Sequence, residues 1–231
     1  MSRASDPSPS SGTSTGASAA VVVRLVAASK SYRRGAETIF AVRDATLDLT
    51  PGSVTVISGP SGSGKTTLLN LILGWEALDH GRREPETLAT DWSSTAVIPQ
   101  RLGLLDHCTI AENVSLPGRA TDLVLDPRDV MRRLAIDHLA DRFPTETSLG
   151  EQQRAAVARA LVSQPRLLIA DEPTSHQDDT NTHRICELLV DAAGRGSCVV
   201  VATHDQRVAA HAHRHLHLTD GRLATGRAEL T

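Results

Sequence analysis

The segment Gly59–Thr66, with the letters GPSGSGKT, has the residue types and the spacing of a loop that binds phosphate. It fits the pattern G-x-x-x-x-G-K-[ST] at every fixed position. The glycines let the backbone curl so that its N–H groups point at phosphate oxygens, and the N-terminus of the following helix adds positive potential. We expect Lys65 to reach the β- and γ-phosphates of a nucleotide, and the Thr66 hydroxyl to bind Mg²⁺.

Lysine is rare in this chain, which makes its presence in the loop informative. Lys30 and Lys65 are the only lysines, whereas arginine occurs throughout. A compact ammonium on a flexible stem suits a phosphate cradle better than the planar fork of arginine. The residues of the loop that we expect to contact the nucleotide are Gly59, Pro60, Ser61, Gly62, Ser63, Gly64, Lys65, Thr66 and Thr67.

Two adjacent acids follow an apolar run later in the chain, in the letters LLIADE. The run predicts a strand, and ligands of α/β sheets bind beyond the carboxyl ends of such strands. Because neighbouring residues of a strand point in opposite directions, we expect Asp171 to face Mg²⁺ and Glu172 to face the γ-phosphate. A carboxylate there can act as the base that polarises an attacking water.

Strands and helices must alternate along the chain to place these residues together. The run 54–58 (VTVIS) is rich in β-branched residues and leads directly into the loop, which predicts a strand buried on both faces of a parallel sheet. The expected strands are 21–27, 41–49, 54–58, 166–170 and 198–203, and the expected helices are 65–73, 126–141, 148–163 and 182–193. This order predicts an α/β domain with a mainly parallel core sheet.

Length, composition and charge limit the classes of protein that fit. A chain of 231 residues fits one large domain. Residues 1–20 are mostly Ser, Ala, Gly, Thr and Pro, which predicts a disordered tail ahead of a domain at 21–231. The net charge of −3, without a basic block, gives no support for nucleic acid as a partner.

The cysteines and the apolar runs indicate the cellular compartment in which we expect the protein. Cys108, Cys186 and Cys198 are odd in number and too far apart for a metal knuckle, so free thiols in a reducing cytoplasm fit best. No apolar run approaches the roughly 20 residues that cross a bilayer. We therefore expect any membrane role to depend on a partner.

The order and spacing of the motifs resemble those of the ATP-binding subunits of ABC transporters, over nearly all of the chain after the tail. The segments that carry the resemblance are GPSGSGKTT, a strand ending in glutamine (STAVIPQ), QQRAAVARAL, LLIADEPT and VATHD. Through the run FPTETSLGEQQRAAVARALVSQPRLLIADEPT, the chain most resembles the lipoprotein-releasing and macrolide-export subfamily. The resemblance implies a P-loop NTPase fold with a helical signature subdomain and with an antiparallel β arm shortened between Gly74 and Gln100.

The resemblance also implies roles for three residues outside the phosphate loop. Tyr32 matches the aromatic residue that stacks on adenine. Gln100 matches the glutamine that contacts Mg²⁺ and the attacking water and senses the membrane partner. His204 matches the histidine that hydrogen-bonds the γ-phosphate and holds the geometry of Glu172. The implied catalytic residues are Lys65, Gln100, Glu172 and His204, and the implied metal ligands are Thr66, Gln100 and Asp171.

In this family the signature segment of one subunit covers the ATP bound to the other. The residues that the resemblance assigns to this contact in trans are Ser148, Leu149, Gly150, Glu151 and Asp178. Leu149 stands where the first glycine is usual, and Ser175–Asp178 (SHQD) departs from the usual small residue and leucine before the aspartate. Ser148 is a good N-cap, so the N–H groups after it can still point at phosphate. The leucine crowds the nucleotide if its side chain points inward, and costs little if it points away.

The function that these observations predict is an ATPase subunit that dimerises around two Mg-ATP and powers a separate membrane permease of an exporter-type system. We expect it in the cytoplasm, on the inner face of the membrane through its permease. One alternative is a nucleotide-gated regulatory or structural partner of a membrane protein, with weak hydrolysis, which the altered signature motivates. A soluble ABC protein of DNA repair or translation usually has two ATPase domains or a long coiled-coil insertion, and neither is visible here.

The alternating run HAHRHLHL is a rival site. In an extended strand His211, His213, His215 and His217 project from one face, where they could bind a divalent metal. The alternative is the polar face of a late strand whose Leu216 and Leu218 face the core, which the lack of a neighbouring acid or cysteine ligand favours.

Overall fold

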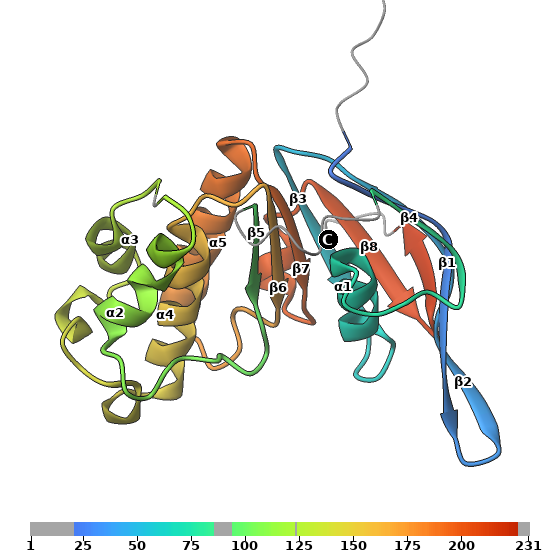
Figure 1. Ribbon diagram of the computed structural model, residues 1–231, viewed down its shortest axis with the longest axis horizontal. Coiled ribbons are helices and arrows are strands. Elements are labelled where there is room, and N and C mark those ends of the chain that lie inside the picture. Colours follow the sequence, from blue (N-terminus) through green and yellow to red (C-terminus); the bar gives the residue numbers. More distant parts are fainter. Residues whose placement is uncertain (1–20, 86–93, 123, 226–231) are drawn as a thin grey trace, which may run out of the picture.

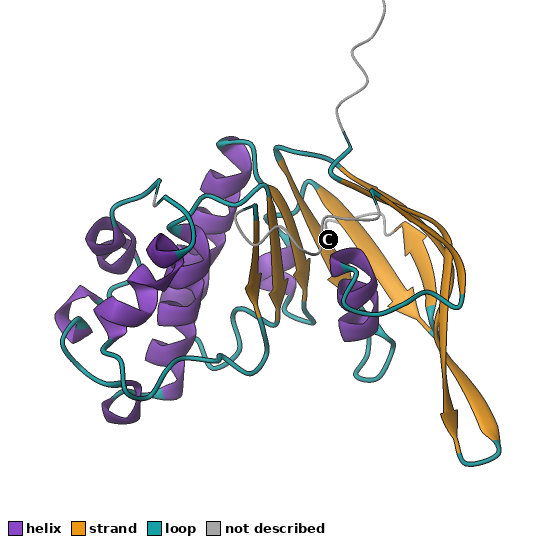
Figure 2. Ribbon diagram, viewed as in Figure 1, coloured by secondary structure: helices purple, strands orange, loops and turns teal. Residues whose placement is uncertain are grey.

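The computed structural model describes residues 21–85, 94–122 and 124–225. Within these residues, nine strands form one sheet in the order β4-β1-β2-β9-β8-β3-β7-β6-β5. Figure 1 shows most of the helices gathered beyond the β5 end of the sheet, and the antiparallel strands β1, β2 and β4 at the opposite end. Figure 2 shows the same division into a helix-rich and a strand-rich side. The expected tail, 1–20, lies outside the described residues.

The bounds of the elements are as follows. The strands are β1 (Val23–Arg34), β2 (Glu37–Leu49), β3 (Ser53–Ser58), β4 (His80–Glu84), β5 (Thr95–Ile98), β6 (Leu167–Asp171), β7 (Cys198–Ala202), β8 (Arg214–Thr219) and β9 (Arg222–Thr225). The α-helices are α1 (Lys65–Leu73), α2 (Ile110–Ser115), α3 (Pro127–Arg133), α4 (Leu149–Leu161), α5 (Asp179–Gly194) and α6 (Gln206–Ala209). Short 3₁₀ helices cover Leu116–Arg119, Asp137–Leu139 and Pro144–Glu146.

The centre of the sheet is parallel. Strand β3 pairs in parallel with β7 on one side and with β8 on the other, and β6 joins β7 to β5 in the same direction. All residues of β6 and β7 are buried, as expected for strands covered on both faces. Because parallel strands end at the same edge, the segments that follow β3, β6 and β7 meet there. The mixed, mainly parallel α/β fold expected from the sequence is confirmed.

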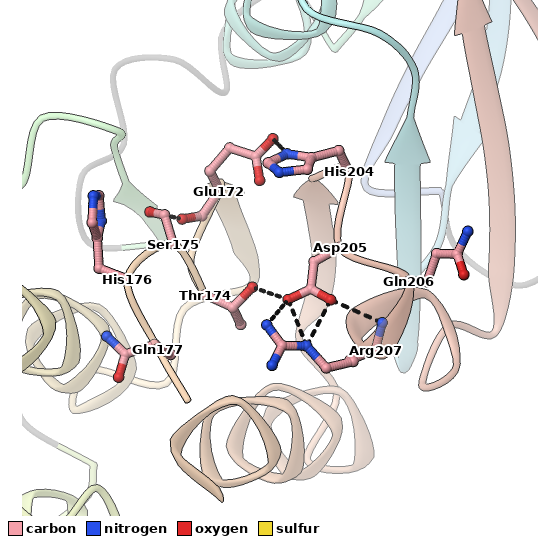
Figure 3. A pocket seen from close by; sticks show the side chains of 9 residues that line it. All are labelled: Glu172, Thr174, Ser175, His176, Gln177, His204, Asp205, Gln206 and Arg207. Carbon is pink, nitrogen blue, oxygen red and sulfur yellow. Dashed lines mark hydrogen bonds and ion pairs between the residues drawn. The ribbon is translucent and has the colours of Figure 1, made fainter. Parts of the chain in front are cut away.

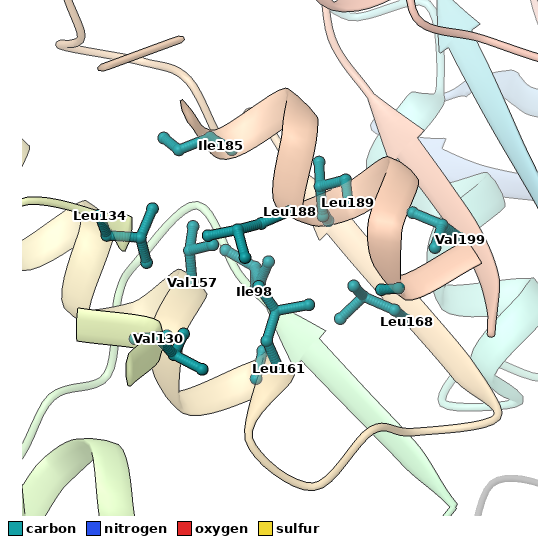
Figure 4. Close-up of a cluster of buried hydrophobic side chains, with 14 of the residues drawn as sticks. Ile98, Val130, Leu134, Val157, Leu161, Leu168, Ile185, Leu188, Leu189 and Val199 are labelled. Carbon is teal, nitrogen blue, oxygen red and sulfur yellow. The ribbon is translucent and has the colours of Figure 1, made fainter. Parts of the chain in front are cut away.

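The two faces of the sheet belong to two apolar cores. One core packs β-strand residues such as Val56 and Leu168 against the helices α2 to α5, and Figure 4 shows this cluster around Leu161 and Leu188. The other packs the opposite face against α1 and the antiparallel arm. Leu161 is only 1% exposed, and burying such a side chain contributes roughly 1.5–3 kcal/mol. The two cores together hold the central strand ends in place.

The antiparallel strands extend further than the sequence predicted. The expected strands 21–27 and 41–49 are the inner parts of β1 and β2, which continue as a hairpin to Arg34 and Glu37. The outer part of this hairpin is mostly exposed, so its residues carry no apolar alternation to reveal a strand. Cross-strand backbone pairing maintains it, together with contacts such as the hydrogen bond from Tyr32 to Glu76.

The expected helix 126–141 is wrong in its second half. Helix α3 ends at Arg133, Ala135 takes a left-handed φ of 54°, and only a 3₁₀ turn follows. Leu134 and Ile136 are both fully buried in the core. In one continuous α-helix, side chains two residues apart point in widely different directions. Ending the helix at Arg133 lets both Leu134 and Ile136 reach the core.

The other expected helices occur close to their expected bounds. Helix α4 begins after the N-cap Ser148, and α5 begins after the N-cap Asp178, whose side chain accepts a hydrogen bond of 2.7 Å from the Asn181 N–H. Among the described residues, none of the helices has the length and apolar character needed to cross a bilayer.

Candidate active site

The phosphate loop is held tightly between two strands. Gly59 and Gly64 have positive φ angles of 151° and 104°. A Cβ on Gly59 would lie 2.2 Å from the carbonyl oxygen of Leu218, and one on Gly64 would lie 2.0 Å from that of Ala41. Glycine is therefore required at both positions for steric reasons as well as for the curled backbone.

Lys65 opens α1 and folds back onto the loop that precedes it. Its Nζ donates hydrogen bonds of 2.7 Å to the Gly59 carbonyl and 3.1 Å to the Pro60 carbonyl. These neutral carbonyls are weaker partners for an ammonium group than phosphate oxygens are. The side chain is thus placed beside the loop, with its charge available to a bound anion.

Thr66 and Asp171 bring two oxygen ligands together from distant parts of the chain. The Thr66 hydroxyl donates a hydrogen bond of 2.8 Å to Asp171 Oδ2. Asp171, the last residue of β6, is 8% exposed, and burial raises its pKa while the hydrogen bond from Thr66 opposes that shift. A hydroxyl and a carboxylate form a hard, all-oxygen donor pair of the kind that Mg²⁺ prefers, so these residues fit that ion.

Glu172 leaves the strand rather than continuing it. Its φ of 51° is left-handed, and its N–H donates a 2.8 Å hydrogen bond to the carbonyl of Ala202. We expected the Glu172 side chain to point away from that of Asp171 because neighbouring strand residues alternate. The left-handed backbone of Glu172, and not this alternation, sets the direction of its side chain. A non-glycine residue in this region costs of order 1–3 kcal/mol, and such strain persists only where surrounding contacts enforce it.

The carboxylate of Glu172 is fixed at both oxygens. The Thr203 hydroxyl donates to Oε2 and the Nδ1 of His204 donates to Oε1, each at 2.8 Å. Figure 3 shows the His204 contact at the rim of a cleft of about 430 Å³. Both donors come from the segment after β7, so the β6 and β7 ends orient the acid together.

Asp205 stabilises that same segment. It accepts a 3.0 Å hydrogen bond from the Thr174 hydroxyl and pairs with Arg207, as Figure 3 shows. The hydrogen bond from Arg207 is the main cause of a lowered pKa at Asp205. Since Thr174 follows Glu172 by two residues, Asp205 ties the segment after β6 to the segment after β7.

Tyr32 borders a cleft of about 510 Å³ that also contains the phosphate loop. The ring is 41% exposed, and its hydroxyl donates a 2.8 Å hydrogen bond to Glu76 Oε2. Burial is the main cause of a raised pKa at Tyr32. The cleft combines an aromatic face from the hairpin with the loop, which is the arrangement that a base and its phosphates require.

Gln100 lies in the loop after β5 and faces two clefts. It lines the cleft of Tyr32, and it lines a second cleft of about 510 Å³ that also contains Glu172 and Leu149. The residues Tyr32, Lys65, Thr66, Gln100, Asp171 and Glu172 all border the first cleft. The structure therefore brings together nucleotide-contacting candidates that are spread over the sequence.

The signature segment lies at the start of α4. The N-cap Ser148 and Glu151 form a capping box, in which the Glu151 carboxylate accepts hydrogen bonds of 2.8 Å from both the N–H and the hydroxyl of Ser148. These hydrogen bonds lower the pKa of Glu151. Leu149 is 49% exposed, and the N-cap Asp178 of α5 is also exposed. Neither residue lines the cleft of Tyr32.

Sequence reasoning missed two residues that orient the expected ones. Thr203, which holds Glu172, stands next to His204 in VATHD, and its hydroxyl after a strand was an available signal. Glu76, which accepts the Tyr32 hydroxyl, lies beyond α1 and carries no motif. The role of Glu76 becomes visible only in the structure, through its hydrogen bond with the distant Tyr32.

The histidine run does not form the expected single face. Strand β8 begins at Arg214, and His211 and His213 precede it. His215 Nε2 and His217 Nδ1 both contact the Ser58 hydroxyl, at 2.8 and 2.9 Å. Leu216 and Leu218 are buried, as predicted for the core side of the strand. No cluster of three or more potential metal ligands occurs in the described part of the chain.

Fold and site define an ATP-binding protein of the P-loop class, and the comparisons with known proteins give its family. The family model described as ABC transporter matches residues 42–175. The chain belongs to this family: it is an ATP-binding subunit of an ABC transporter and an ATPase.

Curated relatives agree with this assignment. The chain is 36% identical to the lipoprotein-releasing system ATP-binding protein LolD of Gluconobacter oxydans, over 91% of this chain and 97% of that protein. It is 33% identical to the macrolide export ATP-binding/permease protein MacB of Burkholderia thailandensis, over 89% of this chain and 34% of that protein. The chain thus spans about a third of the length of this MacB relative.

Solved structures resemble this fold over most of the chain. A dimeric ATP-binding cassette in a post-hydrolysis state with ADP and phosphate matches with a TM-score of 0.77 and 30% identity, over 89% of this chain and 99% of that chain. A dimeric structure of a bacterial ABC transporter cassette matches with a TM-score of 0.78 and 29% identity, with the same coverage.

Proposed function

We propose that the chain dimerises around two Mg-ATP molecules and powers a separate membrane permease of an exporter-type system. The observation that carries this proposal is the grouping of Lys65, Thr66, Asp171 and Glu172 around one cleft, with His204 holding the last of them. Phosphoryl transfer depends on positioning and on charge stabilisation, and these residues supply both.

ATP binding is assigned to the first cleft. Tyr32 stacks on the base, the backbone N–H groups of Gly59–Thr66 surround the phosphates, and Lys65 exchanges its loop carbonyls for phosphate oxygens. Thr66, Asp171 and Gln100 would hold Mg²⁺, and the bound ion would supply positive charge beside the transferred phosphoryl group. The 2.8 Å contact between Thr66 and Asp171 supports this ligand set.

We assign the role of general base in ATP hydrolysis to Glu172. Thr203 and His204 fix its two oxygens, so the carboxylate is oriented before the nucleotide arrives. In this proposal it polarises the attacking water, and His204 also hydrogen-bonds the γ-phosphate. The left-handed backbone of Glu172 supports a dedicated role, because strain of this kind gathers at functional sites.

We assign the signature residues to contacts with the ATP that a second copy of the chain binds. Ser148, Leu149 and Asp178 are exposed and do not line the cleft of Tyr32 in their own subunit. Ser148 is the N-cap of α4, and the N-terminus of a helix is a place that favours an anion. That the related cassettes with TM-scores of 0.77 and 0.78 are dimers supports a homodimer.

The permease is proposed to be a separate chain. The LolD relative is named as the ATP-binding protein of a lipoprotein-releasing system, and the MacB relative as a macrolide export ATP-binding/permease protein, so both names place an ATP-binding part beside a transport system. The names of both groups, lipoprotein release and macrolide export, support an exporter-type system. On this proposal the subunit sits in the cytoplasm, on the inner face of the membrane.

A second candidate is a nucleotide-gated regulatory partner that hydrolyses ATP slowly. The half-exposed Leu149 at the start of α4 favours it, because a glycine there would let a phosphate approach more closely.

The Glu172→Gln substitution tests the leading proposal. The amide cannot serve as the base, so we expect turnover to fall by about 100-fold or more while ATP binding persists. Light scattering with ATP should then show a stable dimer. Glu187→Gln, at an exposed position of α5, is the matched control and should turn over at the wild-type rate. A Glu172→Gln protein that hydrolyses ATP normally contradicts the proposal.

A further inference from the structure

Two of the departures from the family pattern, Leu149 and the segment Ser175–Asp178, lie beside each other in the fold. A Cβ on Gly150 would lie only 2.9 Å from the carbonyl oxygen of His176. Leu149 lines the same cleft as Ser175 and His176. The start of α4 and the segment after β6 are therefore in direct backbone contact, and the glycine at 150 permits it.

Gln177 closes this contact with two hydrogen bonds. Its Nε2 donates to the Gly150 carbonyl at 2.9 Å, and its Oε1 accepts from Arg154 Nη1 at 2.8 Å. Both ends of the amide are used, one as donor and one as acceptor, which fixes its orientation. The leucine that is usual at this position can make neither bond. We call Gly150, Arg154 and Gln177 the amide clamp.

The environment of Arg154 explains why the clamp has an energetic effect. This arginine is 8% exposed, and burial is the main cause of a lowered pKa. A buried guanidinium requires acceptors, and the bond from Arg154 to Gln177 is charge-assisted. Removing the Gln177 acceptor takes this hydrogen-bond partner away from Arg154.

We propose that Gln177 is a positioning residue that joins the start of α4 and the segment Ser175–Asp178 into one rigid unit. The inference rests on the proposed dimer, in which both elements of one subunit face the nucleotide of the other. Joined by the amide clamp, they engage that nucleotide in one step. Ordering them before association lowers the entropy lost when the dimer closes.

The test uses the Glu172→Gln protein, whose ATP-dependent dimer is stable enough to titrate. Gln177→Met keeps the length of the side chain and loses both hydrogen bonds. We expect the ATP concentration for half-maximal dimerisation to rise about tenfold, because the two elements must then be ordered as the dimer closes and no longer before it. The affinity of the monomer for a fluorescent ATP analogue should stay unchanged, because Gln177 does not line the cleft of Tyr32.

Two further variants separate positioning from general stability. Gln177→Glu keeps the acceptor for Arg154 and loses the donor to Gly150, so its dimerisation should fall between that of Gln177 and that of Gln177→Met. Gln206→Met changes a second glutamine of the cleft in Figure 3, which is exposed, and should dimerise as the parent does. Partial rescue by glutamate distinguishes the hydrogen bond from mere packing.

The outcomes distinguish this inference from the proposed function. If the Glu172→Gln parent does not dimerise with ATP, the proposed dimer itself fails. If the parent dimerises and Gln177→Met does so at the same ATP concentration, the amide clamp has no positioning role. A rise in that concentration together with an equal loss of ATP affinity in the monomer also overturns the inference, since it indicates general damage.

Discussion

The phosphate side of the molecule and its signature side are built differently. Asp171, at the end of a strand between two cores, is 8% exposed, whereas Leu149, at the start of α4, is 49% exposed. Thr66, Asp171 and Glu172 are already paired with residues of their own chain. The nucleotide pocket is thus largely ordered in one chain, while the signature residues form a surface suited to a second copy.

The difference is also visible in how each region is stabilised. The phosphate side depends on contacts between residues far apart in sequence, such as Thr66 with Asp171. The signature side depends first on a local capping box and then on the amide clamp. Substitutions on the first side should therefore abolish nucleotide chemistry, and those on the second should change how the dimer closes.

Lys65→Ala should have the largest effect. Removing the ammonium takes away the positive charge that Lys65 places beside the phosphates, so we expect ATP turnover to fall by roughly 100-fold or more. A phosphate-release assay measures it. Lys30→Ala, the matched change at the other lysine, removes ion pairs with Glu76 and Asp79 and should keep turnover within a few-fold. Equal losses in both variants would contradict the assignment.

Gly150→Ala should have an intermediate effect. The added methyl group meets the His176 carbonyl at 2.9 Å, and we expect a stability loss of about 1–3 kcal/mol with weaker dimerisation. Gly194→Ala is the control, because apart from its chain neighbours and its own helix backbone no described atom lies within 4 Å of the added Cβ, and it should stabilise the fold by about 0.5–1 kcal/mol. Thermal or urea unfolding measures both. If Gly150→Ala leaves the free energy of unfolding unchanged, the backbone around His176 can shift to accept the added methyl group.

Leu149→Gly should have the smallest effect. Removing the side chain lets the start of α4 approach a phosphate more closely, so we expect turnover to rise roughly 2- to 5-fold, or about 0.4–1 kcal/mol. Leu149→Ala separates the bulk of the leucine from the freedom of glycine. A much larger gain would favour the slow regulatory partner, and no change would leave the ordinary ATPase.

Motif-based prediction succeeded where the chemistry is local in sequence. The loop Gly59–Thr66 predicts its own conformation, because its glycines and the following helix are adjacent. The N-caps Ser148 and Asp178 were likewise within reach of local rules, although only the first was predicted. The helix expected at 126–141 failed because burying both Leu134 and Ile136 outweighed helical continuity.

The sequence by itself determined the phosphate loop, the paired acids and the alternation of the core strands 54–58, 166–170 and 198–203 with helices. These depend on residue types and short spacings, which act within a few residues. Only the tertiary structure decided that Glu172 turns out of its strand under the hold of Thr203 and His204. It also decided that Gln177 meets Gly150, a pairing across 27 residues that no local pattern encodes. The physical reason is that such contacts form only after the two cores have brought the strand ends and α4 together.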